Sequence, residues 1–249
     1  MSVDDPRAQL LELAKDDEAQ RSRLAICDQF AEWLTRVGRV LWVSGFFIGP
    51  DRAAGLSQFG DDRAVGVATV AQIGGELAAG AIALLRAGNR YAAAALIRQL
   101  VEVEYLAAAF EEEHEVASEW LRADRAGRLR FWSPARLRER STRRFLNTDY
   151  WHHCEMGGHP AGPGMALLPD HSNAVPAAFL AADLFGHLLG IWRGLDVALV
   201  EILSGPPPAD WQLPDLAAPV AGLLESDELY AMFQSLGADM RDGNLEESE

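Results

Sequence analysis

The sequence has few cysteines and no pattern that would pair them. Only Cys27 and Cys154 are present among 249 residues, and they form no C-x-x-C motif. Disulfide frameworks use more cysteines at characteristic spacings and belong to oxidising compartments, so we expect no disulfide. The first residues also lack an apolar core behind a basic start, because acidic residues such as Asp4, Asp5 and Asp16 dominate them. No secretory signal is therefore predicted, and a cytoplasmic location is expected.

The chain also lacks an excess of positive charge and a long uncharged apolar run. Its formal net charge is −15 at pH 7, which repels phosphate backbones at long range and argues against a general nucleic-acid coat protein. The longest weakly charged run, residues 65–85, has Glu76 at its middle, where a bilayer would penalise the carboxylate by ~2–3 kcal/mol. We therefore expect a buried helix there and no contact with a membrane.

Strand patterns, linkers and internal repeats are missing too. No stretch alternates polar and apolar residues as a solvent-facing strand does, and no Gly/Ser linker or acidic spacer interrupts the chain. Apolar residues instead recur at helical spacing, and 49% of all residues are hydrophobic, which is enough for a substantial core. We predict an all-α fold with one domain over residues 1–240, a core over 62–203 and a disordered tail over 241–249.

A hairpin of two long helices is expected to organise this fold. One apolar helix ends at Ala87-Gly88-Asn89, and helical periodicity resumes within two residues, which is the connection length of an antiparallel helix pair. Counted outward from this turn, Glu76 and Arg98 lie at similar depths, so they could face each other. The prediction is a helical bundle built around a long antiparallel hairpin.

The second helix of the hairpin carries the leading candidate residues. Arg98 and Glu102 lie one turn apart in a stretch that is otherwise nearly all apolar, and Tyr91 and Tyr105 flank them as candidate ligand-binding residues. Burying such a charge pair costs free energy, so a protein that keeps one either satisfies it with further hydrogen bonds or uses it in function. A guanidinium held by a carboxylate can point its free donors at an anion. The alternative is a structural ion pair, and Glu104, on another face, is expected at the surface.

His159 is the third candidate catalytic residue. It follows two glycines and precedes a proline, a setting that would fix an imidazole for general acid–base chemistry. The alternative is a cap or a packed ring. Four further residues could form a metal-binding cluster with His159, but they lack a C-x-x-C or H-E-x-x-H motif, and we predict neither a metal nor another cofactor. These residues are His152, His153, Cys154 and His171.

Another apolar helix, predicted over residues 175–203, carries Asp183 and His187 four residues apart. At this spacing the carboxylate can orient the imidazole, as in the arrangement behind many catalytic histidines. The alternative is a satisfied pair in the core.

Positive charge is concentrated in one segment. Residues 122–144 contain nine arginines against two acidic residues, a net charge of +7 that leaves −22 for the rest. Arg136, Arg140, Arg143 and Arg144 fall on one stripe of a predicted helix. This stripe is either a docking site for RNA or nucleotide phosphate or a surface that pairs with the acidic remainder of the protein.

Several of these positions together resemble a family pattern. The positions are Leu85, Gly88, Tyr91, Ala94, Arg98, Glu102, Tyr105 and Leu106, followed by Tyr150 and Gly158-His159-Pro160. They look like a group of uncharacterised bacterial helical proteins that resembles the HEPN superfamily. This resemblance, over about residues 62–168, implies a compact helical bundle, often a homodimer, of the kind found in toxin–antitoxin and antiphage defence systems.

The resemblance also implies a metal-independent ribonuclease. HEPN ribonucleases carry an arginine and a histidine separated by four to six residues, whereas Arg144 and His152 are separated by seven. A composite site would take the place of that motif: His159 would accept the ribose 2′-hydroxyl proton, Arg98 would stabilise the phosphorane charge, and Glu102 would hold Arg98. The alternative is a non-catalytic helical binding or dimerisation module with a structural Arg98–Glu102 pair.

Overall fold

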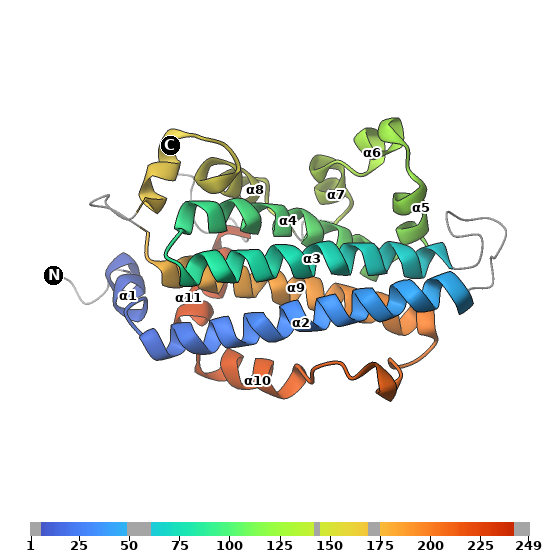
Figure 1. Ribbon diagram of the computed structural model, residues 1–249. Helices are drawn as coiled ribbons and strands as arrows, with labels where there is room; N and C mark the ends of the chain where they lie inside the picture. The colour runs from blue at the N-terminus through green and yellow to red at the C-terminus, as the bar shows by residue number, and fades with distance from the viewer. Residues whose placement is uncertain (1–5, 49–60, 142–144, 169–174, 242–249) are drawn as a thin grey trace.

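Four long helices form the body of the protein in this computed structural model, which describes residues 6–48, 61–141, 145–168 and 175–241 (Figure 1). They are α2 (Asp17–Ile48), α3 (Asp62–Arg86), α4 (Arg90–Glu112) and α9 (Ala177–Leu203). Helix α3 packs between α2 and α4, and α9 packs against α4 and α2, so the four helices enclose one core. Helices are the only regular secondary structure in the described residues, which confirms the all-α prediction.

Shorter helices cover two sides of this bundle. Between α4 and α9 the chain forms α5 (Val116–Arg122), α6 (Arg125–Phe131), α7 (Pro134–Arg140), α8 (Asn147–His153), the π-helical turn η1 (Cys154–Gly158) and the 3-10 turn η2 (Gly162–Leu167). The remaining elements are α1 (Pro6–Leu13), η3 (Ala209–Trp211), α10 (Ala217–Ser226) and α11 (Glu228–Arg241). In Figure 1, α5 to α8 lie on the side of α4, and α10 lies on the opposite side, beside α2.

The predicted helix hairpin is present as α3 and α4. Asp61 caps α3 by accepting a hydrogen bond from the amide of Arg63, and Asn89 caps α4 in the same way through the amide of Ala92. Gly88 takes a positive φ of 76° in the turn between them, a conformation that favours glycine. The hairpin is one side of the bundle, because α3 packs more extensively against α2 than against α4.

The core extends further along the chain than residues 62–203. One cluster of buried residues runs from Leu24 on α2 to Tyr230 on α11. Helix α2 contributes a complete apolar face to it, because its buried positions recur every three or four residues. These positions are Cys27, Phe30, Leu34, Val37 and Leu41, each at most 1% exposed.

Helix α3 is the one described helix that is long and apolar enough to cross a bilayer by length and composition. Half of its most apolar window is buried inside the protein, where α3 packs against α2, α4 and α9. The core helix of a soluble protein passes the same test, and the position of α3 in the bundle agrees with the prediction of a buried helix.

A buried ion pair ties the C-terminal helices to α2. The side chains of Arg23 on α2 and Asp227, the residue before α11, are 1% and 0% exposed. The guanidinium donates from Nη2 to Oδ1 of Asp227 over 2.9 Å and from Nε to Oδ2. The same Oδ1 accepts the backbone amide of Tyr230 at 3.0 Å. This pair therefore fixes the first turn of α11, which forms part of the pocket described next.

Candidate functional site

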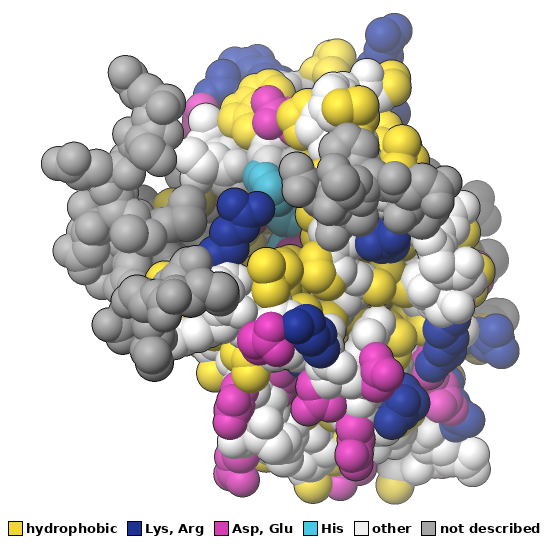
Figure 2. All heavy atoms as spheres, turned by 90° about the vertical axis from the view of Figure 1, so that its left-hand side faces the viewer, with side chains coloured by type: hydrophobic (Ala, Val, Ile, Leu, Met, Phe, Trp, Pro, Cys, Tyr) yellow, Lys and Arg dark blue, Asp and Glu magenta, His cyan; other side chains and the backbone are white. Residues whose placement is uncertain are grey.

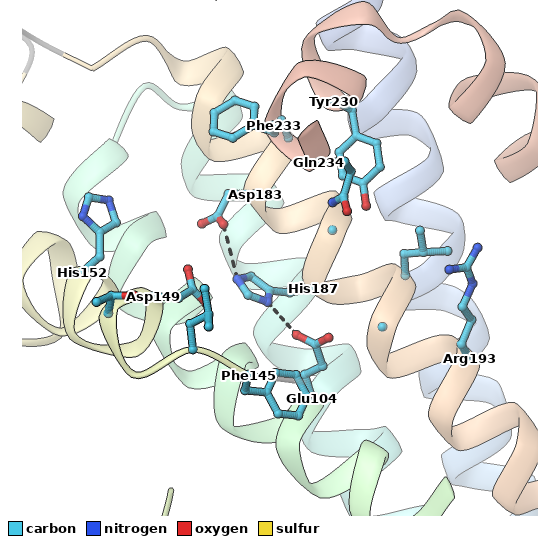
Figure 3. Close-up of a pocket in the computed structure, with 16 residues that line it drawn as sticks. Glu104, Phe145, Asp149, His152, Asp183, His187, Arg193, Tyr230, Phe233 and Gln234 are labelled. Atoms are coloured by element: carbon cyan, nitrogen blue, oxygen red, sulfur yellow. Dashed lines mark hydrogen bonds and ion pairs between the residues drawn. The ribbon is translucent and has the colours of Figure 1, made fainter. Parts of the chain in front are cut away.

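A pocket of about 710 Å³ lies between α4, α9, α11 and the segment that leads into α8. In Figure 3, α9 crosses the pocket, with Asp183 and His187 on one side of the helix and Arg193 on the other. Gly186 and Gly190 of the same helix also line the pocket, with the ring of Tyr230 close to the first and the carboxylate of Glu104 close to the second. Its walls are mainly apolar and aromatic, and they include Phe145, Leu146, Leu189, Tyr230 and Phe233.

His187 is the centre of a polar network in the wall of this pocket. Its Nδ1 donates to Oε2 of Glu104 over 2.7 Å, and its Nε2 lies 3.3 Å from Oδ1 of Asp183 (Figure 3). A second imidazole, that of His153 at the end of α8, places Nε2 at 3.0 Å from Oδ2 of Asp183 and at 3.2 Å from Nε2 of His187. The Nδ1 of His153 donates to the backbone carbonyl of Asp149 over 2.9 Å. Helices α4, α8 and α9 thus meet at one polar cluster.

The hydrogen bonds determine where the protons of the two imidazoles lie. A backbone carbonyl and an ionised carboxylate only accept hydrogen bonds, so each Nδ1 carries a proton. In neutral imidazoles both Nε2 atoms then present lone pairs, and they face each other and the Asp183 carboxylate within 3.0–3.3 Å. Three acceptors at this distance repel unless positive charge lies among them. The cluster therefore holds either additional protons or a metal ion.

Without a metal, protons supply this charge. Burial alone would lower the pKa of His187, but the carboxylates of Asp183 and Glu104 outweigh it, and the pKa lies well above its ordinary value. The pKa of His153 is raised against its burial in the same way, chiefly by Asp183. The pKa of Asp183 is lowered, because the two imidazoles outweigh the burial that would raise it. The metal-free network is therefore held as ion pairs.

A metal ion fits the same three side chains. His153, Asp183 and His187 form a group that could hold a metal ion, with ligand atoms close enough to share one centre. Two atoms bound at about 2.1 Å are ~3.0 Å apart at a right angle and ~3.4 Å apart at the tetrahedral angle. The two Nε2 atoms are 3.2 Å apart, and each lies 3.0 or 3.3 Å from one of the two Asp183 oxygens, so these separations lie in this range. The two imidazoles are 8% and 11% exposed and Asp183 is 32% exposed, so open coordination positions would face the pocket beside Asp183.

A glycine on α9 allows this network to form. A Cβ at position 190 would lie 2.0 Å from Oε1 of Glu104, so a larger residue would displace the carboxylate from His187. Glu104 is 13% exposed, which corrects the expectation that it lies at the surface. Its buried position is a consequence of the close approach of α4 to α9.

Arg98 and Glu102 form the predicted pair, with Nη1 of Arg98 2.6 Å from Oε1 of Glu102. Arg98 also donates from Nη2 to the Tyr150 hydroxyl over 2.7 Å and from Nε to Sγ of Cys154 over 3.2 Å. These bonds fasten α8 and η1 to α4. The side chains of Arg98 and Glu102 are 15% and 39% exposed, so the pair lies at the edge of the packed interior.

The turn that contains His159 lies next to Arg98. A Cβ at Gly158 would lie 3.2 Å from Cγ of Arg98, and the hydroxyl of Tyr91 donates to the backbone carbonyl of His159 over 3.1 Å. The His159 side chain is exposed and makes no hydrogen bond or ion pair with Arg98 or Glu102 in the part of the chain that the structure describes. Figure 2 shows this end of the bundle, where histidine and Lys/Arg side chains lie on the side of α8 and acidic side chains gather below.

The other predicted ligand-binding residues do not join this site. Tyr105 is 1% exposed and packs against Phe145 with the two rings tilted by 49° and their centroids 4.4 Å apart, so its ring is packed away from solvent. Arg140 lies over the ring of Trp132 at 5.3 Å and 3.9 Å from Glu113, in line with a charged surface that pairs with acidic residues. Three further candidates, Arg143, Arg144 and His171, lie outside the described residues.

Comparison with protein-family models, with curated proteins and with solved structures found no match to this chain. The resemblance to HEPN proteins therefore stays a prediction. The pocket network combines one predicted pair, Asp183 and His187, with two residues that the sequence did not join to it, His153 and Glu104. The sequence signal was an acidic residue on each of two apolar helices, but it did not reveal that these helices face each other.

Proposed function

We propose that this protein is a metal-dependent hydrolytic enzyme whose metal ion is held by His153, Asp183 and His187. The observation that carries this proposal is the convergence, at the wall of a pocket, of two imidazole nitrogens 3.2 Å apart and a carboxylate whose two oxygens lie 3.0 and 3.3 Å from them. Two imidazoles and one carboxylate are a ligand set of catalytic zinc sites, in which water or substrate takes the remaining position. A closed structural site would instead have four protein ligands.

Zinc is the metal that suits the proposed reaction. The same ligand set accepts Fe²⁺, but Zn²⁺ binds a given set of nitrogen and oxygen ligands more tightly. Zinc with three protein ligands lowers the pKa of bound water to about 7 and so supplies a nucleophile near neutral pH. Glu104 and the carbonyl of Asp149 would hold both imidazoles in the tautomer that leaves Nε2 free, as outer partners of metal-binding histidines do.

The first test is the binding of Zn²⁺ itself. Calorimetric titration should show one high-affinity ion per chain in the wild-type protein. His187→Gln and Asp183→Asn should each weaken binding by about 100-fold or more, because even outer partners of metal ligands contribute 10–100-fold. His152→Gln is the matched control, since His152 is an exposed neighbour of His153 outside the triad. Wild-type protein that binds no Zn²⁺, or a His187 variant that binds it normally, would refute the metal site.

The second test is the reaction class. Nitrophenyl esters of carboxylic and phosphoric acids report hydrolysis by absorbance. Activity that a chelator removes and Zn²⁺ restores would support the enzyme, with the restored rate lost in Asp183→Asn. Protein that holds zinc but hydrolyses neither ester class would leave the metal in a structural role and would contradict this part of the proposal.

A second candidate function uses Arg98, Glu102 and His159 on RNA phosphate, as the HEPN resemblance implies. In its favour, the Gly158 turn packs on Arg98, and Arg98 has partners for three of its donors out of the five that a guanidinium carries. Two donors are thus left for an anion. RNA cleavage that persists in chelator and is lost in His159→Gln would support this function. Absence of RNA cleavage would leave Arg98 and Glu102 as a structural pair within a non-catalytic module.

The same resemblance implies a homodimer. Sedimentation equilibrium measures the mass in solution directly, and a monomer of 27.2 kDa would reject this expectation without bearing on the metal site.

A further inference from the structure

Among the described residues, the pocket has an arginine on the other side of α9 from the proposed metal site. Arg193 follows His187 by six residues on α9, which places it about 9 Å further along the helix axis at ~1.5 Å per residue. Both side chains line the pocket, and Figure 3 shows them on opposite sides of α9, since positions six residues apart are separated by about 120° around the helix axis. Within the described ranges Arg193 makes no hydrogen bond or ion pair, and no other arginine or lysine lines the pocket.

A hydroxyl group accompanies this guanidinium. Tyr230 of α11 lies against α9, where a Cβ at Gly186 would be 3.7 Å from its hydroxyl oxygen. Its ring packs edge-on against Phe185 at 4.8 Å, and burial raises the pKa of Tyr230 to about 12. The hydroxyl therefore keeps its proton at neutral pH, and no described side chain accepts it. Arg193 and Tyr230 together offer donors to one anionic group.

Apolar side chains line much of the space between the two ends, although Gln234 of α11 lies beside Tyr230 (Figure 3). The apolar lining includes Phe145, Leu189 and Phe233, together with Gly186 and Gly190. At the metal end, the negative charges of Glu104 and Asp183 are already paired with imidazoles. A ligand with its charge at that end would leave Arg193 unpaired. A ligand with its charge at the Arg193 end complements both ends of the pocket.

We infer that the pocket takes amphipathic organic carboxylates, with the carboxylate on Arg193 and Tyr230 and the reacting group at the proposed metal site, about 9 Å away along the axis of α9. The inference deepens the proposed function and rests on it for the reacting end. A carboxylate fits better than a phosphate monoester, because a single guanidinium in a protein of net charge −15 would leave one charge of a dianion uncompensated.

The anion site is tested first without metal. Calorimetry compares octanoate with octanamide, which has the same chain and no charge, on protein stripped of metal. Octanoate should bind about fivefold more tightly, as a partly exposed charge pair allows, and Arg193→Gln should abolish the difference. Arg125→Gln, the same change on the exposed surface of α6, should preserve it. Equal binding of the two compounds by the wild-type protein would overturn the inference.

The distance is tested with zinc bound. Suberic acid monohydroxamate can bind the metal through one end and Arg193 through the other, whereas octanohydroxamate has only the metal-binding end. The wild-type protein should favour the charged compound by about fivefold, and Arg193→Gln should bind both equally. Equal affinities in zinc-loaded wild-type protein would overturn the two-ended arrangement. Failure of Zn²⁺ itself to bind would instead refute the proposed function. In that case the comparison of octanoate with octanamide on metal-free protein still decides whether Arg193 binds the carboxylate.

Discussion

Replacement of Gly190 by alanine should damage the network without removing a polar group. The added methyl carbon would lie 2.0 Å from Oε1 and 2.6 Å from Cδ of Glu104, far inside van der Waals contact. The Glu104 side chain is the flexible partner, so it must move away. Its 2.7 Å hydrogen bond to Nδ1 of His187 is then lost.

The expected magnitudes follow from that single displacement. Loss of a hydrogen bond between charged groups costs roughly 1.5–3 kcal/mol of unfolding free energy. Alanine is more favourable than glycine within a helix by about 1 kcal/mol, which offsets part of this loss. Gly190→Ala should therefore lower the unfolding free energy by about 0.5–2 kcal/mol. Because Glu104 also orients a proposed metal ligand, Zn²⁺ affinity should fall by about 10–100-fold.

Gly186→Ala provides the control for this substitution. Gly186 lies one turn away on the same helix, and a Cβ there would be 3.4 Å from Cε2 of Tyr230, an ordinary contact. This variant should be as stable as wild type or more stable by up to about 1 kcal/mol, with unchanged Zn²⁺ affinity. Urea unfolding and zinc calorimetry measure both quantities. If Gly190→Ala matches Gly186→Ala in both, the reasoning about Glu104 is wrong.

Three further predictions concern stability. Asp227→Asn leaves the Arg23 charge buried without its counter-ion, so urea unfolding should show a loss of about 3–5 kcal/mol; a loss below 1 kcal/mol, at about the level of an exposed pair, would contradict this. The pKa of Tyr230 is about 12 in the folded protein against about 10 when unfolded. Its contribution to the unfolding free energy is therefore complete below pH 10 and is lost as the pH rises toward 12, by up to roughly 2–3 kcal/mol. Tyr230→Phe should remove this loss of stability at alkaline pH, as urea unfolding at several pH values would show. Arg98→Ala removes the ties from α4 to residues 147–158, so amide exchange should accelerate in that segment and not in α9.

Much of the fold could be predicted because its signals are local. Helix ends depend on a few neighbouring residues: Asn89 caps α4 at the turn that the sequence indicated, and Asp61 caps α3 in the same way. The Arg98–Glu102 pair also follows from spacing along one helix, and it is confirmed. The expected contact between the two helices of the hairpin was wrong. Glu76 does not face Arg98 but lines a depression with Arg39 of α2.

The sequence by itself determined the helices, their amphipathic faces and the pairs four residues apart, because each depends on the geometry of one helix. The tertiary structure alone decided the site. His153 and Glu104 reach His187 from 34 and 83 residues away, and their meeting depends on how α4, α8 and α9 rotate about their axes when they pack. A rotation of one helix by a quarter turn would preserve every local pattern and separate these side chains.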